Sequence, residues 1–135
     1  MSFSLSLSVE GFKRRAFAVL LVLFLHAQAL RGLAISLPVT VPAHPFLSAK
    51  DIMEVFAGLK ELYPTSFSGL FHSNDPAAVM KVVNDVRCSL EEAGIDFPVI
   101  ENAPNRRGYR LHHRVVNLAV PALALLQPPG KSQGA

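Results

Sequence analysis

The chain has 135 residues, half of them apolar, so it is long enough to form a single domain with a packed core. Its 13 lysines and arginines outnumber the 10 acidic residues, and the net charge of +3 permits an acidic partner without requiring one. The single cysteine, Cys88, excludes a fold held together by internal disulfides. The 10 prolines divide the chain into short elements.

Residues 1–31 form an apolar N-terminal segment that allows several interpretations. Within it, a basic patch is followed by the apolar run 16–25 and by the sequence Ala-Gln-Ala. This order is typical of a secretory signal peptide that is cleaved near Ala29. Extended from Ala16 to Ile35, the stretch would be long enough for a membrane anchor. It is equally typical of a buried first helix of the core.

Three further stretches carry weaker patterns. Residues 1–9 alternate serine with apolar residues, which indicates either a short edge strand or an unstructured leader. Residues 33–41 are rich in strand-forming residues but contain Pro38, so we expect an edge strand or an extended linker. Residues 119–135 begin as an apolar extension and end with the composition of a disordered tail.

A helix is predicted over residues 48–62. It begins with a capping-box-like sequence at Ser48 and stops before Pro64, because the residue that precedes a proline disfavours helical geometry. Its apolar residues recur at helical spacing and define one buried face: Ile52, Val55, Phe56, Leu59 and Leu62. A short additional helix is expected around residues 67–71.

A second amphipathic helix is predicted over residues 77–93. Asp75 before Pro76 is a favourable start, and Gly94 is a favourable stop because glycine accepts the left-handed conformation that ends helices. One face is apolar and carries Val79, Val83, Val86 and Leu90. The opposite face carries Lys81, Asn84, Asp85 and Cys88.

A β-hairpin is predicted directly after this helix. An apolar run that includes Phe97 and Ile100 gives the first strand, residues 103–107 give the turn, and residues 108–111 give the returning strand. Residues 102–114 contain arginines and no acidic residue: Arg106, Arg107, Arg110 and Arg114. A hairpin of this charge suits a polyanion, because arginine matches the geometry of phosphate groups.

The pattern Val83-x-x-Val86-Arg87-x-x-Leu90, then Ile100, then Gly108-Tyr109-Arg110-Leu111 resembles the winged helix-turn-helix domain of bacterial response regulators. The resemblance is best over residues 76–111. It implies an α+β domain over residues 32–118, with two to four helices and a C-terminal β-hairpin wing. Either helix 48–62 or the N-terminal apolar segment would be the first helix of that domain.

The resemblance also implies a function and its site. The chain would be a small cytoplasmic regulator of transcription that binds double-stranded DNA through helix 77–93 and the basic wing 102–114. Lys81 and Asn84 would face the major groove, where lysine meets guanine or phosphate and asparagine pairs with adenine. The remaining candidates would contact or support contacts to phosphates: Arg87, Arg106, Arg107 and Arg110.

No pattern in the sequence predicts catalysis, a metal site or a cofactor. His112 and His113 are adjacent, and on a strand they would point to opposite faces and so would share a metal poorly. Cys88 has no evident base nearby, and no phosphate-binding glycine loop occurs. We therefore expect a protein that is not an enzyme. The alternative to a DNA-binding regulator is an exported or membrane-anchored module that binds another protein.

Overall fold

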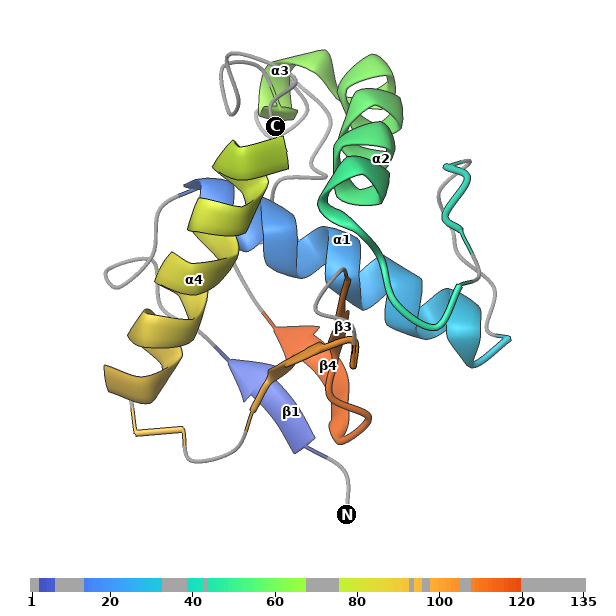
Figure 1. Cartoon of the computed structure of the whole chain (residues 1–135). Coiled ribbons are helices and arrows are strands. Elements are labelled where there is room, and N and C mark those ends of the chain that lie inside the picture. The colour runs from blue at the N-terminus through green and yellow to red at the C-terminus, as the bar shows by residue number, and fades with distance from the viewer. Residues whose placement is uncertain are drawn as a thin grey trace, which may run out of the picture.

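The computed structural model has an α+β fold, as the sequence predicts (Figure 1). It describes residues 3–6, 14–32, 39–42, 44–67, 76–92, 94–95, 98–104 and 108–119. The helices in this part of the chain are α1 (Arg14–Leu30), α2 (Ala49–Leu62), α3 (Pro64–Phe67) and α4 (Pro76–Glu92). The strands are β1 (Phe3–Ser6), β2 (Ile100–Asn102), β3 (Tyr109–Leu111) and β4 (Val115–Ala119).

Helix α1 is the centre of the core. Every residue from Ala16 to Leu23 is buried, which is the expected state of a helix that is apolar all round. The helix packs against α2, α4, β3 and β4, so the apolar N-terminal segment and the region after residue 32 contribute to one core. It ends at Leu30 and is followed by Gly32, whose φ of 73° is readily adopted only by glycine. Within the described part of the chain, no helix has the length and apolar character needed to cross a membrane.

Helix α2 begins with the capping box expected at Ser48. The Ser48 hydroxyl accepts from the Asp51 amide (3.1 Å), and the Asp51 carboxylate accepts from the Ser48 amide (3.0 Å). The predicted face is buried except for Leu62, which is 39% exposed in the last turn, where the chain bends into α3. The prediction that Leu62 belongs to the core is therefore wrong.

A short helix that the sequence did not predict, α3, directly precedes most of the stretch where a short helix was expected. Helix α3 covers Pro64–Phe67 and ends where the expected helix would begin. Proline suits the first helical position because its φ is already helical and its missing amide proton is not needed there. Phe67 is buried, and its ring lies 6.2 Å from that of Phe56, which fixes α3 against α2.

Helix α4 covers Pro76–Glu92, one residue earlier at each end than the predicted 77–93, and it has the predicted buried face. Val79, Val83, Val86 and Leu90 are at most 4% exposed, and the helix packs against α1 and α2. Its end is a Schellman motif: the Ile95 amide donates to the Leu90 carbonyl (3.1 Å) and the Gly94 amide donates to that of Glu91 (3.0 Å). Gly94 has the φ of 88° that this motif requires.

The strands form two separate pairs. Strands β1 and β4 are parallel, with Leu5 beside Leu118, and lie side by side in Figure 1, so of the two interpretations of residues 1–9 the structure has the short strand, over Phe3–Ser6. Strands β2 and β3 form an antiparallel hairpin after α4, as predicted, but β2 begins at Ile100, where the expected strand was to end, and runs to Asn102. A third backbone segment joins this hairpin at Leu47, whose amide and carbonyl exchange hydrogen bonds with those of Tyr109 (2.8 and 2.7 Å).

Several sequence predictions concern residues outside the described ranges. They are the cap at Asp75, the strand position of Phe97, the wing arginines Arg106 and Arg107, most of the segment 33–41, the helix expected over 68–71 and the tail after residue 119.

Candidate nucleic-acid interface

The outer face of α4 carries the side chains that the helical spacing predicts. Lys81 and Asn84 are exposed, as are Asp85 and Cys88. The opposite side of α4 is held against α1 and α2, so this outer face is available to a partner. The charge on α4 is divided along its length.

In the first two turns, Lys81 is the only charged side chain. The later turns carry Asp85, Glu91 and Glu92, all exposed. Carboxylates repel phosphates, so contact with a nucleic acid would be confined to the N-terminal half of this helix.

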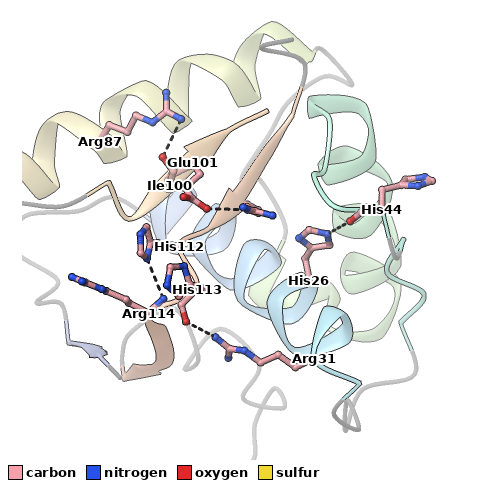
Figure 2. A network of polar contacts seen from close by, with 10 residues as sticks. His26, Arg31, His44, Arg87, Ile100, Glu101, His112, His113 and Arg114 are labelled. Atoms are coloured by element: carbon pink, nitrogen blue, oxygen red, sulfur yellow. Dashed lines mark hydrogen bonds and ion pairs between the residues drawn. The ribbon is translucent and has the colours of Figure 1, made fainter. Parts of the chain in front are cut away.

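Arg87 is directed from α4 to the hairpin. One of its guanidinium nitrogens donates to the Ile100 carbonyl (3.3 Å), as Figure 2 shows, and also to the side-chain oxygen of Asn102. The guanidinium also lies over the Tyr109 ring, 5.7 Å from its centre. Arg87 therefore fixes the hairpin relative to α4. The same contacts hold the Arg87 side chain in one position on the flank of the helix.

The Arg110 side chain contacts two neighbouring residues. Its Nε donates to the Glu101 carboxylate (2.9 Å), and its guanidinium lies 4.5 Å from the centre of the Phe46 ring. Glu101 directly precedes the acid-free stretch 102–114 and is the partner of Arg110 in the β2–β3 register. Because the ion pair is partly exposed, its contribution to stability is small, about 0–1 kcal/mol. Its effect on charge is larger, since it cancels one of the cations of the hairpin.

Arg106 and Arg107 fall between Pro104 and Gly108 in the sequence, and both lie outside the described residues. Of the described residues on either side of them, the Ala103 amide donates to the Gly108 carbonyl (2.9 Å). Their assignment to the interface therefore rests on the sequence.

Gly108 is required by a close approach of two backbone segments. A Cβ atom at this position would lie 2.7 Å from the Cβ of Phe46 and 3.3 Å from the Leu47 carbonyl oxygen. The first distance is well below an ordinary carbon–carbon contact of about 3.5–4.0 Å, and the second is a tight contact between carbon and oxygen. The absence of a side chain at Gly108 therefore allows residues 46–47 to lie against β3.

The histidine pair at the far end of β3 differs from the sequence prediction. Strand β3 ends at Leu111, so His112 and His113 lie in a turn where the alternation of a strand no longer applies. Their rings stack, with centres 4.3 Å apart, and do not point to opposite faces. The stacked rings remove the reason for which the sequence predicted no metal at this pair, and that prediction stays untested. Among the described residues, no three histidine, cysteine or acidic side chains are grouped to hold an ion.

The turn after β3 is fixed to the end of α1 by Arg31. A single nitrogen of its guanidinium donates to the carbonyls of His113 (3.1 Å) and Val115 (3.0 Å), as Figure 2 shows for His113. Arg114 is exposed beside it, and its backbone amide donates to His112 (3.1 Å). This end of the hairpin therefore carries two arginines: Arg114, which belongs to the predicted basic wing, and Arg31, which the sequence did not place there.

Sequence reasoning missed three residues that organise this region: Phe46, Glu101 and His26. The position of Glu101 could have been inferred by aligning the two strands of the hairpin. Phe46 and His26 carry no local signal, because their partners lie far away in the chain. Comparisons with family models, with curated proteins and with solved structures found no match for this chain.

Proposed function

We propose that the chain is a winged-helix protein that binds double-stranded DNA. The observation that carries the proposal is the order of the elements after β1. A helix (α1) is followed by a bridging strand position at Leu47, by α2, the short α3 and α4, and then by a β-hairpin whose second strand pairs with Leu47. This order is expected of a winged helix in which α1 is the first helix, α4 the recognition helix and β2–β3 the wing.

The contacts proposed for α4 are limited to its first half. Lys81 would bind phosphate or guanine, and Asn84 would pair with adenine. The amino-terminal end of a helix also carries a partial positive charge, which favours phosphates near Pro76. Of the carboxylates in the later turns, Asp85 would lie at the edge of the groove, and Glu91 and Glu92 would lie further along the helix, beyond the duplex contacts.

The wing would supply the remaining cations. Arg106 and Arg107 are proposed to bind the phosphate backbone, and such contacts position a protein more than they specify a sequence. Arg87 and Arg110 are proposed to hold the wing in place. A DNA-binding regulator of this kind would act in the cytoplasm.

The test exploits the divided charge of α4. Asp85 would lie at the edge of the groove, and a unit charge about 5 Å from a phosphate in water interacts by about 0.8 kcal/mol. Asp85→Asn should therefore increase affinity for any duplex by roughly fourfold at low salt. Glu92→Gln removes the same charge about 10 Å further along the helix and should have a much smaller effect.

Fluorescence anisotropy with a labelled random duplex measures both affinities. Lys81→Ala should weaken binding under the same conditions. Equal effects of Asp85→Asn and Glu92→Gln would contradict the proposed orientation of α4 on DNA, and no effect of all three variants would contradict the use of this face.

A second candidate function is binding of another protein through the same face of α4. It is favoured by the mixed charge of this face and by the internal use of Arg87 and Arg110. If residues 1–31 target the chain to a membrane or out of the cell, this function would replace DNA binding. It predicts that duplex binding is absent even at low ionic strength.

A further inference from the structure

His26 is a fully buried polar side chain in the middle of the core. It lies on α1, has 0% exposed surface and points toward the segment that precedes α2 (Figure 2). Its Nε2 lies 2.7 Å from the His44 carbonyl oxygen. A carbonyl only accepts, so Nε2 carries the proton and donates it to this hydrogen bond. In the neutral ring, Nδ1 is then an acceptor, and it has no hydrogen-bond partner among the described residues.

A second proton on this ring would be unfavourable. Burial is the main cause that lowers the pKa of His26, and the positive charges of Arg110 on β3 and of His44 act in the same direction. The hydrogen bond to His44 and the carboxylate of Asp51 on α2 oppose the effect without reversing it. The protonated ring would need a new acceptor for Nδ1–H, and none of the described residues supplies one, so the ring would have to reach water.

The backbone held by His26 supports the hairpin. Two residues beyond His44, the Phe46 ring lies under the Arg110 guanidinium (4.5 Å to the ring centre). The next residue, Leu47, exchanges two hydrogen bonds with Tyr109 on β3. Arg87 of α4 lies over the Tyr109 ring. A continuous set of contacts therefore runs from the α1 core through residues 44–47 to the hairpin and α4.

We propose that His26 is a proton-sensitive anchor for residues 44–47, and that acidification releases this segment and with it the position of the β2–β3 hairpin. Protonation would occur only in the opened form, in which the ring reaches water. The consequence for DNA rests on the proposed function: release of the hairpin would weaken duplex binding because the wing would no longer be fixed relative to α4.

Hydrogen exchange of the Leu47 and Tyr109 amides tests the anchor without DNA. These two amides donate to each other's carbonyls, so their protection reports directly on whether residues 44–47 remain attached to β3. The protection factors of these two amides, corrected for intrinsic exchange, should be constant down to about pH 6.5, the ordinary pKa of an exposed histidine. Below that pH they should fall by about tenfold per pH unit, because His26 takes up a proton in the opened form while it stays neutral in the closed form. Constant protection down to about pH 5 would overturn the proposal.

His26→Gln is the diagnostic variant, because a glutamine amide still donates to the His44 carbonyl but does not titrate. It should make the protection of both amides independent of pH. His113→Gln, at an exposed histidine, is the matched control and should retain the wild-type pH dependence. The same pH dependence in His26→Gln as in wild type would overturn the proposal.

Wild-type protein alone gives a further measurement in case His26→Gln does not fold. The His26 ring resonances should titrate together with the loss of Leu47 and Tyr109 protection. Titration of the ring with both amides still protected would contradict the anchor.

Anisotropy with duplex DNA at the same pH values then separates the two claims: pH-dependent protection without any duplex binding retains the anchor and refutes the DNA function. Duplex binding whose pH dependence is unchanged in His26→Gln refutes the anchor alone.

Discussion

Gly108→Ala tests whether residues 46–47 and the hairpin are packed as closely as the structure indicates. The added methyl group would lie 2.7 Å from the Phe46 Cβ, which is attached to backbone and cannot swing away as the end of a long side chain would. Relief of the contact requires the two segments to separate by about 1 Å. A shift of that size would stretch the Leu47–Tyr109 hydrogen bonds, now 2.8 and 2.7 Å, beyond the usual range.

Two routes give a similar magnitude for the loss of stability. If the segments stay together, overpacking costs about 1–3 kcal/mol. If they separate, the two hydrogen bonds are broken at a cost of about 0.5–1.5 kcal/mol each. Replacement of glycine also restricts the unfolded chain, which stabilises the protein by about 0.4–1 kcal/mol. We therefore expect Gly108→Ala to lower the free energy of unfolding by about 1–2 kcal/mol.

Gly58→Ala is the matched control. Gly58 lies within α2, and a Cβ there would meet only the Val39 side chain at 3.6 Å, an ordinary contact. Alanine favours a helix over glycine by about 0.5–1 kcal/mol, so this variant should be more stable than wild type. Urea denaturation of the three proteins measures both changes. A Gly108→Ala variant as stable as Gly58→Ala would refute the close approach of residues 46–47 to β3.

Three other predictions concern the core and its pH dependence. Leu90→Ala should cost about 2–5 kcal/mol through reduced burial and a cavity, whereas Cys88→Ser on the exposed face should cost little; equal damage in thermal melts would contradict the orientation of α4. Deletion of residues 1–30 removes α1 and should abolish cooperative unfolding, so a native-like melt of the shortened chain would contradict its place in the core. Because the pKa of His26 is lowered in the folded protein, the neutral ring contributes stability that is present above about pH 6.5 and is lost as the pH falls. Urea denaturation at a series of pH values measures this loss of stability. If the same loss occurs in His26→Gln, it comes from groups other than His26.

The local elements of the fold were predictable because their signals are local. The spacing of Val86 and Leu90 on one face of α4 and the glycine at position 94 fix the phase and the end of that helix. The capping box at Ser48 fixes the start of α2 in the same way. Each of these signals involves residues within a few turns of one another.

The role of α1 was ambiguous in the sequence for a physical reason. A run of apolar residues is favourable both in a membrane and in a protein core, since either environment removes it from water. Only the partners of the helix distinguish a membrane segment from a core helix. These partners are distant in the sequence, so no local pattern identifies them: α2, α4, β3 and β4. The sequence therefore left three interpretations where the structure has a central core helix.

The candidate site was predictable only in part because its organising contacts are between distant residues. Tyr109 pairs with Leu47, and Gly108 lies against Phe46, across about sixty residues of chain. The histidine pair shows a different limit. The prediction of opposite faces assumed that the strand continued through His113, whereas β3 ends at Leu111.

Salt-dependent binding of the full-length protein to random duplex DNA tests the proposed function most directly. Fluorescence anisotropy at a series of salt concentrations should give a dissociation constant that rises with salt, because bound phosphates release their counterions. Arg106→Ala combined with Arg107→Ala should leave the thermal melt intact and lower the salt slope by about one for each phosphate that the variant no longer binds. Full-length protein that shows no salt-dependent binding, even at low ionic strength, would contradict DNA binding and favour a protein partner.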